Sequence, residues 1–177
     1  MNSVKLGDKS IYPSKVVCVG RNYLEHIKEL NNAVPDEMVV FNKPSSSISS
    51  QLISHHGETL HYEGEICFIV SGGQLSAVGL GLDLTKRELQ SKLKNKGLPW
   101  ERAKAFDGSA VFSRFVSLNG IAIESLEIEL FINCVRVQKG AVTQMMYTPQ
   151  TIIEELRTYT TLNAVSYTHL RAHETEY

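Results

Sequence analysis

Short apolar runs and longer stretches of helical period both occur along the chain, in an irregular order. Apolar or alternating runs predict strands at 16–19, 39–41, 59–70, 79–84, 126–132 and 136–138. Apolar side chains three and four residues apart predict helices at 22–31, 85–96 and 148–159. The order of these elements predicts an α+β fold that is rich in β-structure, because it lacks the regular alternation of a doubly wound sheet.

Two of the predicted helices carry recognisable end signals. Asn22 with Glu25 has the spacing of a capping box, and so does Thr85 with Glu88. Gly97 stands where a helix that begins at Thr85 is expected to end, since glycine is common just after a helix.

The predicted strand at 59–70 has two unlike faces. One face is apolar, and the other carries His61, Glu63, Glu65 and Cys67. Gly64 interrupts the apolar face, which indicates a bulge or the close approach of another backbone.

The two glutamates on this strand are candidate metal ligands. Glu63 and Glu65 are two residues apart, so their Cβ atoms lie about 7 Å from each other. Carboxylates this close repel unless one is protonated or a cation lies between them. If the sheet brings Asp83 near them, three hard oxygen ligands converge, which suits Mg²⁺ or Mn²⁺ better than zinc. The alternative interpretation is a solvated acidic edge.

Several polar side chains near the predicted helices have a functional and a plain interpretation. His26 and Glu29 are neighbours on one helix face, and such a pair either activates water as a general base or lies on the surface. Arg87, Gln90 and Lys104 could face the acidic residues, but each taken singly is expected to be solvated.

Composition and charge narrow the function classes. The 177 residues are 42% hydrophobic and 21% charged, with 18 Lys and Arg against 19 Asp and Glu. A net charge of −1 without a long basic cluster argues against nucleic acid or anionic lipid as a partner. We find no membrane-spanning run or secretory signal, and expect a cytoplasmic protein. Cys18, Cys67 and Cys134 are far apart and are expected to be buried thiols.

Three segments taken together are more specific than any single motif. They are 17–23 with His26 and Glu29, then 61–65, and finally 82–90 followed by 97–100 and 103–107. In order and content they resemble the fumarylacetoacetate hydrolase family over roughly residues 12–162, in particular its acylpyruvate hydrolase and oxaloacetate decarboxylase types. The resemblance implies a mixed β-rich roll with flanking helices, usually dimeric.

The resemblance also implies roles for individual residues. The metal ligands would be Glu63, Glu65 and Asp83, with Mg²⁺ or Mn²⁺ as the ion. The catalytic residues would be His26 and Glu29 of a lid helix, together with Lys104. The substrate-binding residues would be Arg21, Gln90 and Lys104.

The activity implied is cleavage of a carbon–carbon bond in a 2-oxo or 2,4-dioxo acid, through a pyruvate enolate that the metal stabilises. Acylpyruvate hydrolysis and oxaloacetate decarboxylation both fit, with a small 2-oxo acid as substrate and a homodimer as the assembly. The alternative is an inactive fragment, or a remnant that binds a divalent ion or metabolite. A simple β-rich interaction module would leave the three segments unexplained.

The chain departs from the family pattern at several places. Glu88 stands where the family usually has Asp, and the stretch between Val70 and Gly79 is shorter than usual. Cys134 stands after Asn133, where the family usually has glycine. After Leu162, the family's Thr-Gly-Thr-Pro loop and later strands are not recognisable. We therefore expect an incomplete family domain at 1–162, with C-terminal strands missing, and a non-family tail of artefactual origin at 163–177.

Overall fold

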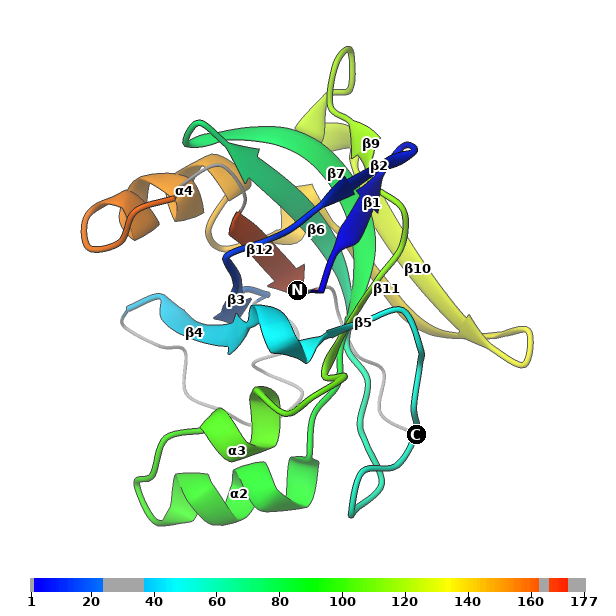
Figure 1. Cartoon of the computed structure of the whole chain (residues 1–177), viewed down its shortest axis with the longest axis vertical. Helices are drawn as coiled ribbons and strands as arrows, with labels where there is room; N and C mark the ends of the chain where they lie inside the picture. The colour runs from blue at the N-terminus through cyan, green and yellow to red at the C-terminus, as the bar shows by residue number, and fades with distance from the viewer. Residues whose placement is uncertain (1, 24–36, 163–165, 172–177) are drawn as a thin grey trace.

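An eight-stranded mixed sheet forms the centre of the computed structural model, which describes residues 2–23, 37–162 and 166–171. Seven strands follow the order β4-β3-β12-β6-β7-β8-β5, and β9 pairs with β7 (Figure 1). Their bounds are β3 Lys15–Gly20, β4 Val39–Pro44, β5 Ile48–Ser49, β6 Gly64–Ser71, β7 Gln74–Asp83, β8 Ala110–Phe112, β9 Val116–Ser117 and β12 Ser166–Arg171. Two further hairpins pair β1 Val4–Leu6 with β2 Lys9–Ile11, and β10 Glu127–Ile132 with β11 Val135–Ala141. This arrangement confirms the predicted β-rich α+β fold.

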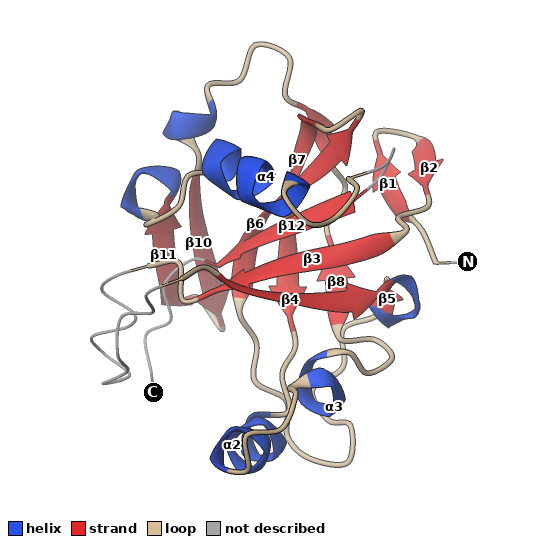
Figure 2. Cartoon of the chain, turned by 90° about the vertical axis from the view of Figure 1, so that its left-hand side faces the viewer, coloured by secondary structure: helices blue, strands red, loops and turns tan. Residues whose placement is uncertain are grey.

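The α-helices in the described residues are α2 Arg87–Asn95, α3 Glu101–Lys104 and α4 Pro149–Arg157. Short 3-10 turns occur at η1 Ser45–Ser47, η2 Ile123–Ser125 and η3 Val142–Gln144. Figure 2 shows α4 against the sheet, while α2 and α3 lie together beyond the ends of the strands. Within the described part of the chain, no helix has the length and apolar character needed to cross a membrane. The helix predicted at 22–31 lies outside the described residues beyond Tyr23.

Hydrophobic side chains fill both faces of the sheet. On one face, Val17 and Phe68 pack with the apolar side of α4, including Ile152 and Leu156. On the other face, Val16 and Cys67 belong to a second cluster around Phe115. Each strand in the middle of the sheet therefore buries both sets of alternating side chains.

The structure corrects two expectations for residues 59–70, namely where the strand begins and whether its acidic face is solvated. The strand begins at Gly64 rather than Thr59, and every residue of β6 from Gly64 to Val70 is buried. A solvated acidic edge is therefore wrong, because the polar face points into the protein. Gly64 does mark a close approach, but by a side chain and not by another backbone, since a Cβ added there would lie 3.1 Å from the Oε1 of Gln138.

The ends of α2 show one prediction confirmed and one wrong. Gly97 adopts a φ of 64° just after the helix, as expected. Thr85 does not cap the helix, because its buried hydroxyl accepts a hydrogen bond from Lys104 at 2.6 Å. The carboxylate of Glu58 instead accepts the amide N–H of Glu88 at 3.2 Å. The first turn of the helix is therefore capped by Glu58, which is distant in sequence, and not by Thr85.

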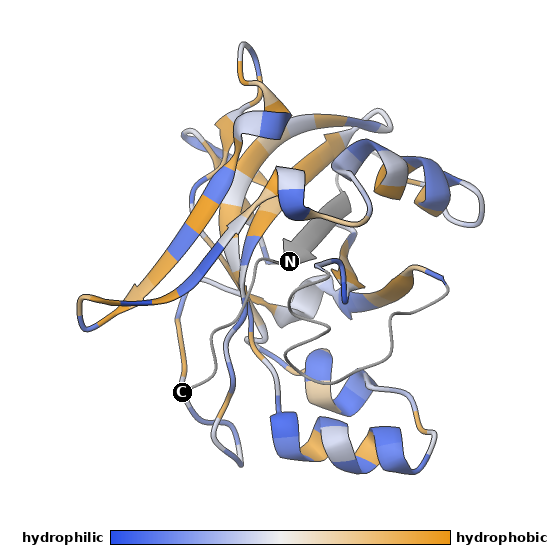
Figure 3. Cartoon of the chain, turned by 180° about the vertical axis from the view of Figure 1, so that it is seen from behind, coloured by the Kyte–Doolittle hydropathy of each residue, from blue (hydrophilic) through white to orange (hydrophobic). Residues whose placement is uncertain are grey.

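Two tight turns set the registers of the hairpins. Gly72 and Gly73 join β6 to β7 with φ values of 58° and 77°, as a turn with two left-handed residues requires. Asn133 and Cys134 join β10 to β11 with φ values of 49° and 66°. Cys134 is exposed in this turn, so the prediction of a buried thiol is wrong for it and confirmed for Cys18 and Cys67. Figure 3 shows the β10–β11 hairpin reaching away from the rest of the protein.

The strand β12 lies within the stretch expected to be a non-family tail. It pairs in parallel with β3 and antiparallel with β6, and so lies between them in the sheet (Figure 1).

Candidate metal and substrate site

The three predicted metal ligands meet at one end of the β6–β7 hairpin. The backbone N–H of Asp83 donates to the carbonyl of Glu63 at 2.8 Å, and Glu65 pairs with Gly81. This register brings carboxylate oxygens of Glu63, Glu65 and Asp83 within 4.8 Å of one another. The side chains are buried, with only 2%, 2% and 1% of their surface exposed. The geometry is that of a buried triad of hard oxygen donors.

Lys104 contacts this triad directly. It is the last residue of α3, and its Nζ lies 2.7 Å from Asp83 Oδ2 and 3.1 Å from Glu63 Oε2. The ammonium also donates to Thr85 Oγ1 at 2.6 Å. Buried charges are tolerated when they are paired and hydrogen-bonded, so the solvated lysine expected from its residue type alone is wrong.

Lys43 is a site residue that the sequence analysis missed. Its Nζ lies 2.8 Å from Asp83 Oδ1, and its side chain is completely buried at the end of β4. It also donates to the backbone carbonyls of Leu84, Ser109 and Lys104. A signal was available, because alternation along β4 places Lys43 on the same face as two apolar residues, Val39 and Phe41.

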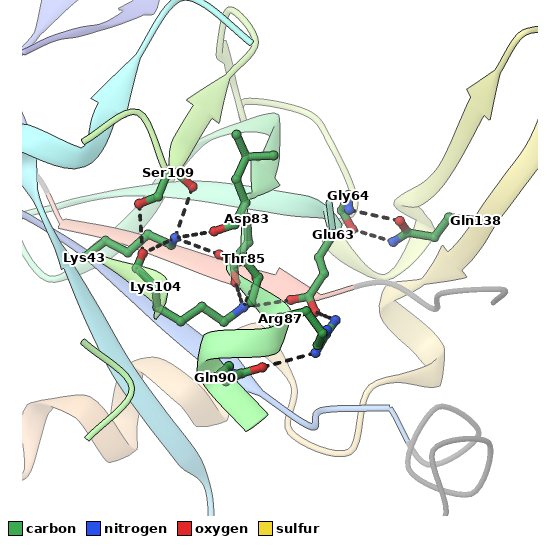
Figure 4. A network of polar contacts seen from close by, with 11 residues as sticks. Lys43, Glu63, Gly64, Asp83, Thr85, Arg87, Gln90, Lys104, Ser109 and Gln138 are labelled. Atoms are coloured by element: carbon green, nitrogen blue, oxygen red, sulfur yellow. Dashed lines mark hydrogen bonds and ion pairs between the residues drawn. The ribbon is translucent and has the colours of Figure 1, made fainter. Parts of the chain in front are cut away.

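The first turns of α2 supply two more polar groups. Arg87 Nη2 lies 2.8 Å from Glu63 Oε1, and its Nη1 donates to Gln90 Oε1 at 3.2 Å (Figure 4). Gln90 is buried and Arg87 is half-buried. Both were expected on the surface when judged singly, whereas the structure joins them to the acidic triad.

Positive charge also gathers beside the triad. Arg21 is half-buried at the end of β3, in the left-handed conformation with a φ of 56°. Burial, together with the charges of Arg21, Arg87 and Lys104, lowers the pKa of Lys94 to about 8. The Nζ of Lys94 lies 4.8 Å from the ring centroid of Trp100. Several cations thus approach the same region, which favours an anionic ligand there.

His26 and Glu29, the predicted catalytic pair, lie outside the described residues. The last described residues before this pair are Asn22 and Tyr23, and Asn22 is fixed by hydrogen bonds to Tyr147. Its side-chain amide donates to the Tyr147 carbonyl at 3.0 Å, and its Oδ1 accepts the Tyr147 N–H at 2.8 Å.

The donor set fits a hard divalent ion. Carboxylate oxygens are the ligands that Mg²⁺ and Mn²⁺ prefer. Within the described residues, the ligand atoms that converge are carboxylate oxygens of Glu63, Glu65 and Asp83, and the thiols are not among them. Burial and the nearby carboxylates raise the pKa of Cys18 and Cys67 well above the usual value. The site therefore suits Mg²⁺ or Mn²⁺ and not a thiolate-bound metal.

Comparisons with known proteins agree with this geometry. The model of the fumarylacetoacetate (FAA) hydrolase C-terminal family matches residues 15–166. Oxaloacetate tautomerase YcgM of Escherichia coli (strain K12) is 34% identical over 172 residues, which cover 86% of this chain and 78% of that protein. The mitochondrial oxaloacetate tautomerase FAHD1 of Homo sapiens is 34% identical over 164 residues, with 83% and 74% covered.

Solved structures share the fold. One from Oleispira antarctica, described as a fumarylacetoacetate isomerase/hydrolase, superimposes with a TM-score of 0.90 at 31% identity, covering 97% of this chain and 86% of that one. Fumarylpyruvate hydrolase from Pseudomonas aeruginosa, solved in complex with Mn²⁺ and pyruvate, has a TM-score of 0.86 at 23% identity, with 94% and 82% covered.

Proposed function

Because the chain belongs to the fumarylacetoacetate hydrolase family, we propose that it is a divalent-metal-dependent enzyme that interconverts the enol and keto forms of oxaloacetate. The observation that carries this proposal is the buried triad of Glu63, Glu65 and Asp83, whose oxygens lie within 4.8 Å of one another. The names of the two oxaloacetate tautomerases at 34% identity support the choice of substrate.

The formal charges around the triad favour a dicarboxylic substrate. Three carboxylates face two buried ammonium groups, of Lys43 and Lys104, and the guanidinium of Arg87. These six groups balance one another, so a bound divalent ion adds two positive charges to those of Arg21 and Lys94 nearby. A dianion such as oxaloacetate offsets more of this positive charge than a monoanionic 2-oxo acid does.

A cavity of about 630 Å³ adjoins the site. It lies between β4 and α3, and its lining includes Lys43, Lys104 and Trp100. A volume in this range holds a small metabolite. Of the lysines that line it, Lys43 and Lys104 also contact Asp83. These two side chains therefore connect the cavity to the triad, although none of the three carboxylates lines it.

The proposed chemistry is a proton transfer. A divalent ion bound to the triad supplies a Lewis acid that stabilises the negative charge of an enolate. Lys104 and Gln90 are proposed to hold the substrate by hydrogen bonds, and Arg21 to bind one of its carboxylates. His26 with Glu29 is proposed to take the proton from carbon 3, while the electron pair moves toward the oxygen on carbon 2, which is protonated in turn.

Cleavage of a carbon–carbon bond is the second candidate function. Acylpyruvate hydrolysis and oxaloacetate decarboxylation also pass through an enolate, so the same charged groups serve them. The fold shared with a fumarylpyruvate hydrolase that was crystallised with Mn²⁺ and pyruvate favours this candidate. Hydrolysis would need His26 and Glu29 to activate water, whereas decarboxylation would not, so His26→Ala is expected to impair hydrolysis more than decarboxylation.

Paired assays separate the candidates. The purified chain is given oxaloacetate, and enol loss is followed by ultraviolet absorbance while pyruvate is measured separately; acetylpyruvate is the substrate for hydrolysis. Each assay is run with Mg²⁺, with Mn²⁺, with chelator and with metal but no protein, because free ions also act on oxaloacetate. We expect metal-dependent enol–keto conversion that exceeds pyruvate release.

Substitution of one ligand tests the site itself. Glu65→Ala is expected to abolish metal-dependent turnover, because it removes one of three metal oxygens. The matched control is Glu129→Ala, which removes an exposed glutamate of β10 that pairs with Arg136. Full activity of Glu65→Ala would contradict the assignment. Mn²⁺ binding without turnover of any substrate by the unmodified chain would instead identify a binding remnant.

A further inference from the structure

Gln138 forms two hydrogen bonds with the main chain between the two candidate metal-binding glutamates. Its Oε1 accepts the backbone N–H of Gly64 at 2.9 Å, and its Nε2 donates to the carbonyl of Gly64 at 2.5 Å (Figure 4). The side chain is only 1% exposed. Gln138 belongs to β11, outside the hairpin that carries the carboxylates, so this contact connects two separate sheets.

The contact lies just beyond the described pairing of β12 with β6. Within the described residues this pairing ends at Glu65, and Gly64 lies one residue further along. At that position the main-chain donor and acceptor of Gly64 are both satisfied by one side-chain amide. A side-chain amide has one donor group and one acceptor, as a backbone peptide unit does. Gln138 therefore makes with Gly64 the two hydrogen bonds that a residue of a neighbouring strand would make.

The geometry couples Gln138 to the directions of the glutamates. The N–H of Gly64 belongs to the peptide shared with Glu63, and its carbonyl belongs to the peptide shared with Glu65. Fixing both peptide planes fixes the bonds from which the two carboxylate side chains depart. Side chains alternate along a strand, so Gln138, which lies where a Cβ of Gly64 would point, approaches from the face opposite to Glu65. Its two hydrogen bonds to this strand are to the backbone.

We propose that Gln138 is a positioning residue of the metal site, which holds Glu63 and Glu65 in place through the main chain of Gly64. This inference rests on the proposed function in one respect, namely that the triad binds a divalent ion. Glycine at position 64 is part of the same device, because an added Cβ would lie 3.1 Å from Oε1 and 3.5 Å from Cδ of Gln138.

The test measures Mn²⁺ binding directly, by electron paramagnetic resonance of free Mn²⁺, far below the melting temperature. Groups that orient metal ligands typically contribute about 10–100-fold to affinity. Gln138→Met keeps the length of the side chain and removes both hydrogen bonds, and we expect about tenfold weaker binding. The matched control is Gln144→Met, which removes an exposed glutamine bond to the backbone N–H of Ala141 at the end of the same hairpin.

A double-substitution cycle keeps the proposal testable if Gln138→Met folds poorly. Gly64→Ala crowds the amide while retaining it, and it is expected to weaken Mn²⁺ binding in the unmodified chain. In a Gln138→Ala background the crowding is gone, so the same substitution is expected to have little further effect. A role through the metal also predicts that activity of Gln138→Met recovers as Mn²⁺ is raised, which a general loss of packing does not predict.

The outcomes are distinct. Weaker Mn²⁺ binding by Gln138→Met, with unchanged binding by Gln144→Met, supports the proposal. Unchanged Mn²⁺ affinity in a folded but less stable Gln138→Met overturns it. Absence of Mn²⁺ binding by the unmodified chain overturns the metal site and this inference together. Normal Mn²⁺ binding without turnover of oxo acids overturns only the proposed function, and the effect of Gln138 on affinity then still supports its positioning role.

Discussion

Replacement of Lys43 by methionine tests the charge balance of the site. Methionine keeps most of the aliphatic stem and removes the ammonium that lies 2.8 Å from Asp83 Oδ1. The three backbone carbonyls that accept from Lys43 also lose a donor. The lysine is completely buried, so water does not replace these contacts without local opening.

Two measurable changes of opposite direction follow. Removal of one partner from a buried ion pair costs about 3–5 kcal/mol, which for a chain of this size corresponds to a fall in Tm of roughly 6–20 °C. The loss of a positive charge beside a metal-binding carboxylate favours a cation there, so Mn²⁺ is expected to bind more tightly. Each tenfold gain in affinity returns about 1.4 kcal/mol of stability at saturating metal.

Thermal unfolding with and without Mn²⁺ measures both effects. The difference in Tm between the unmodified chain and Lys43→Met is expected to be large in chelator and to narrow as Mn²⁺ is added. Lys139→Met, on the exposed side of β11, serves as the control and is expected to change stability by less than about 0.5 kcal/mol. A Tm difference that widens with Mn²⁺ would refute the reasoning, because it would mean that Lys43 favours the ion by holding Asp83 in place.

Two further predictions concern a turn and a cation. Cys134→Gly is expected to stabilise the protein by about 1 kcal/mol in thermal unfolding, because the exposed cysteine holds a φ of 66° that costs about 1–2 kcal/mol in a residue other than glycine; a lower Tm would contradict this. The pKa of Lys94 is about 8 in the folded protein and 10.5 ordinarily, so between these pH values the unfolded chain binds more protons than the folded one. The charge of Lys94 therefore destabilises the folded protein fully below pH 8. This destabilisation is lost as the pH rises toward 10.5. Lys94→Met is therefore expected to raise Tm near neutral pH by an amount that shrinks as the pH rises, and a difference independent of pH would count against this assignment.

The features that could be predicted from the sequence are those set by the spacing of residues within one strand, helix or hairpin. The buried strand at β3 and the apolar side of α4 follow from spacing along a few residues. The carboxylate triad could be predicted because Glu63 and Glu65 share a face and the register of one hairpin brings Asp83 beside them. The comparisons confirm the resemblance to the fumarylacetoacetate hydrolase family that the three segments indicated.

The remaining site residues depend on contacts between distant segments. The partner of Lys43 lies forty residues away on another strand, and spacing within one element carries no information about such pairs. Thr85 matched a capping box, yet in the structure its hydroxyl accepts a hydrogen bond from Lys104. The carboxylate of Glu58 instead accepts the backbone N–H of Glu88 at the start of the helix. The sequence showed Gln138 only as a polar residue of a predicted strand. Its partner is the backbone of Gly64, and a backbone partner cannot be identified from residue types.

The acidic triad is sensitive to the number of residues between it and the turn at Gly72 and Gly73. The turn and the carboxylates stand at opposite ends of a hairpin whose strand β6 has eight residues, roughly 25 Å at the usual rise. Deletion of one residue between them would shift every later side chain to the other face of the sheet and carry Glu65 away from Asp83. Insertions in the turn would leave the alternation of each strand intact. Evolution can therefore lengthen this hairpin at its tip, while a single-residue deletion between Ile66 and Ser71 would disrupt the metal site without removing any of its ligands.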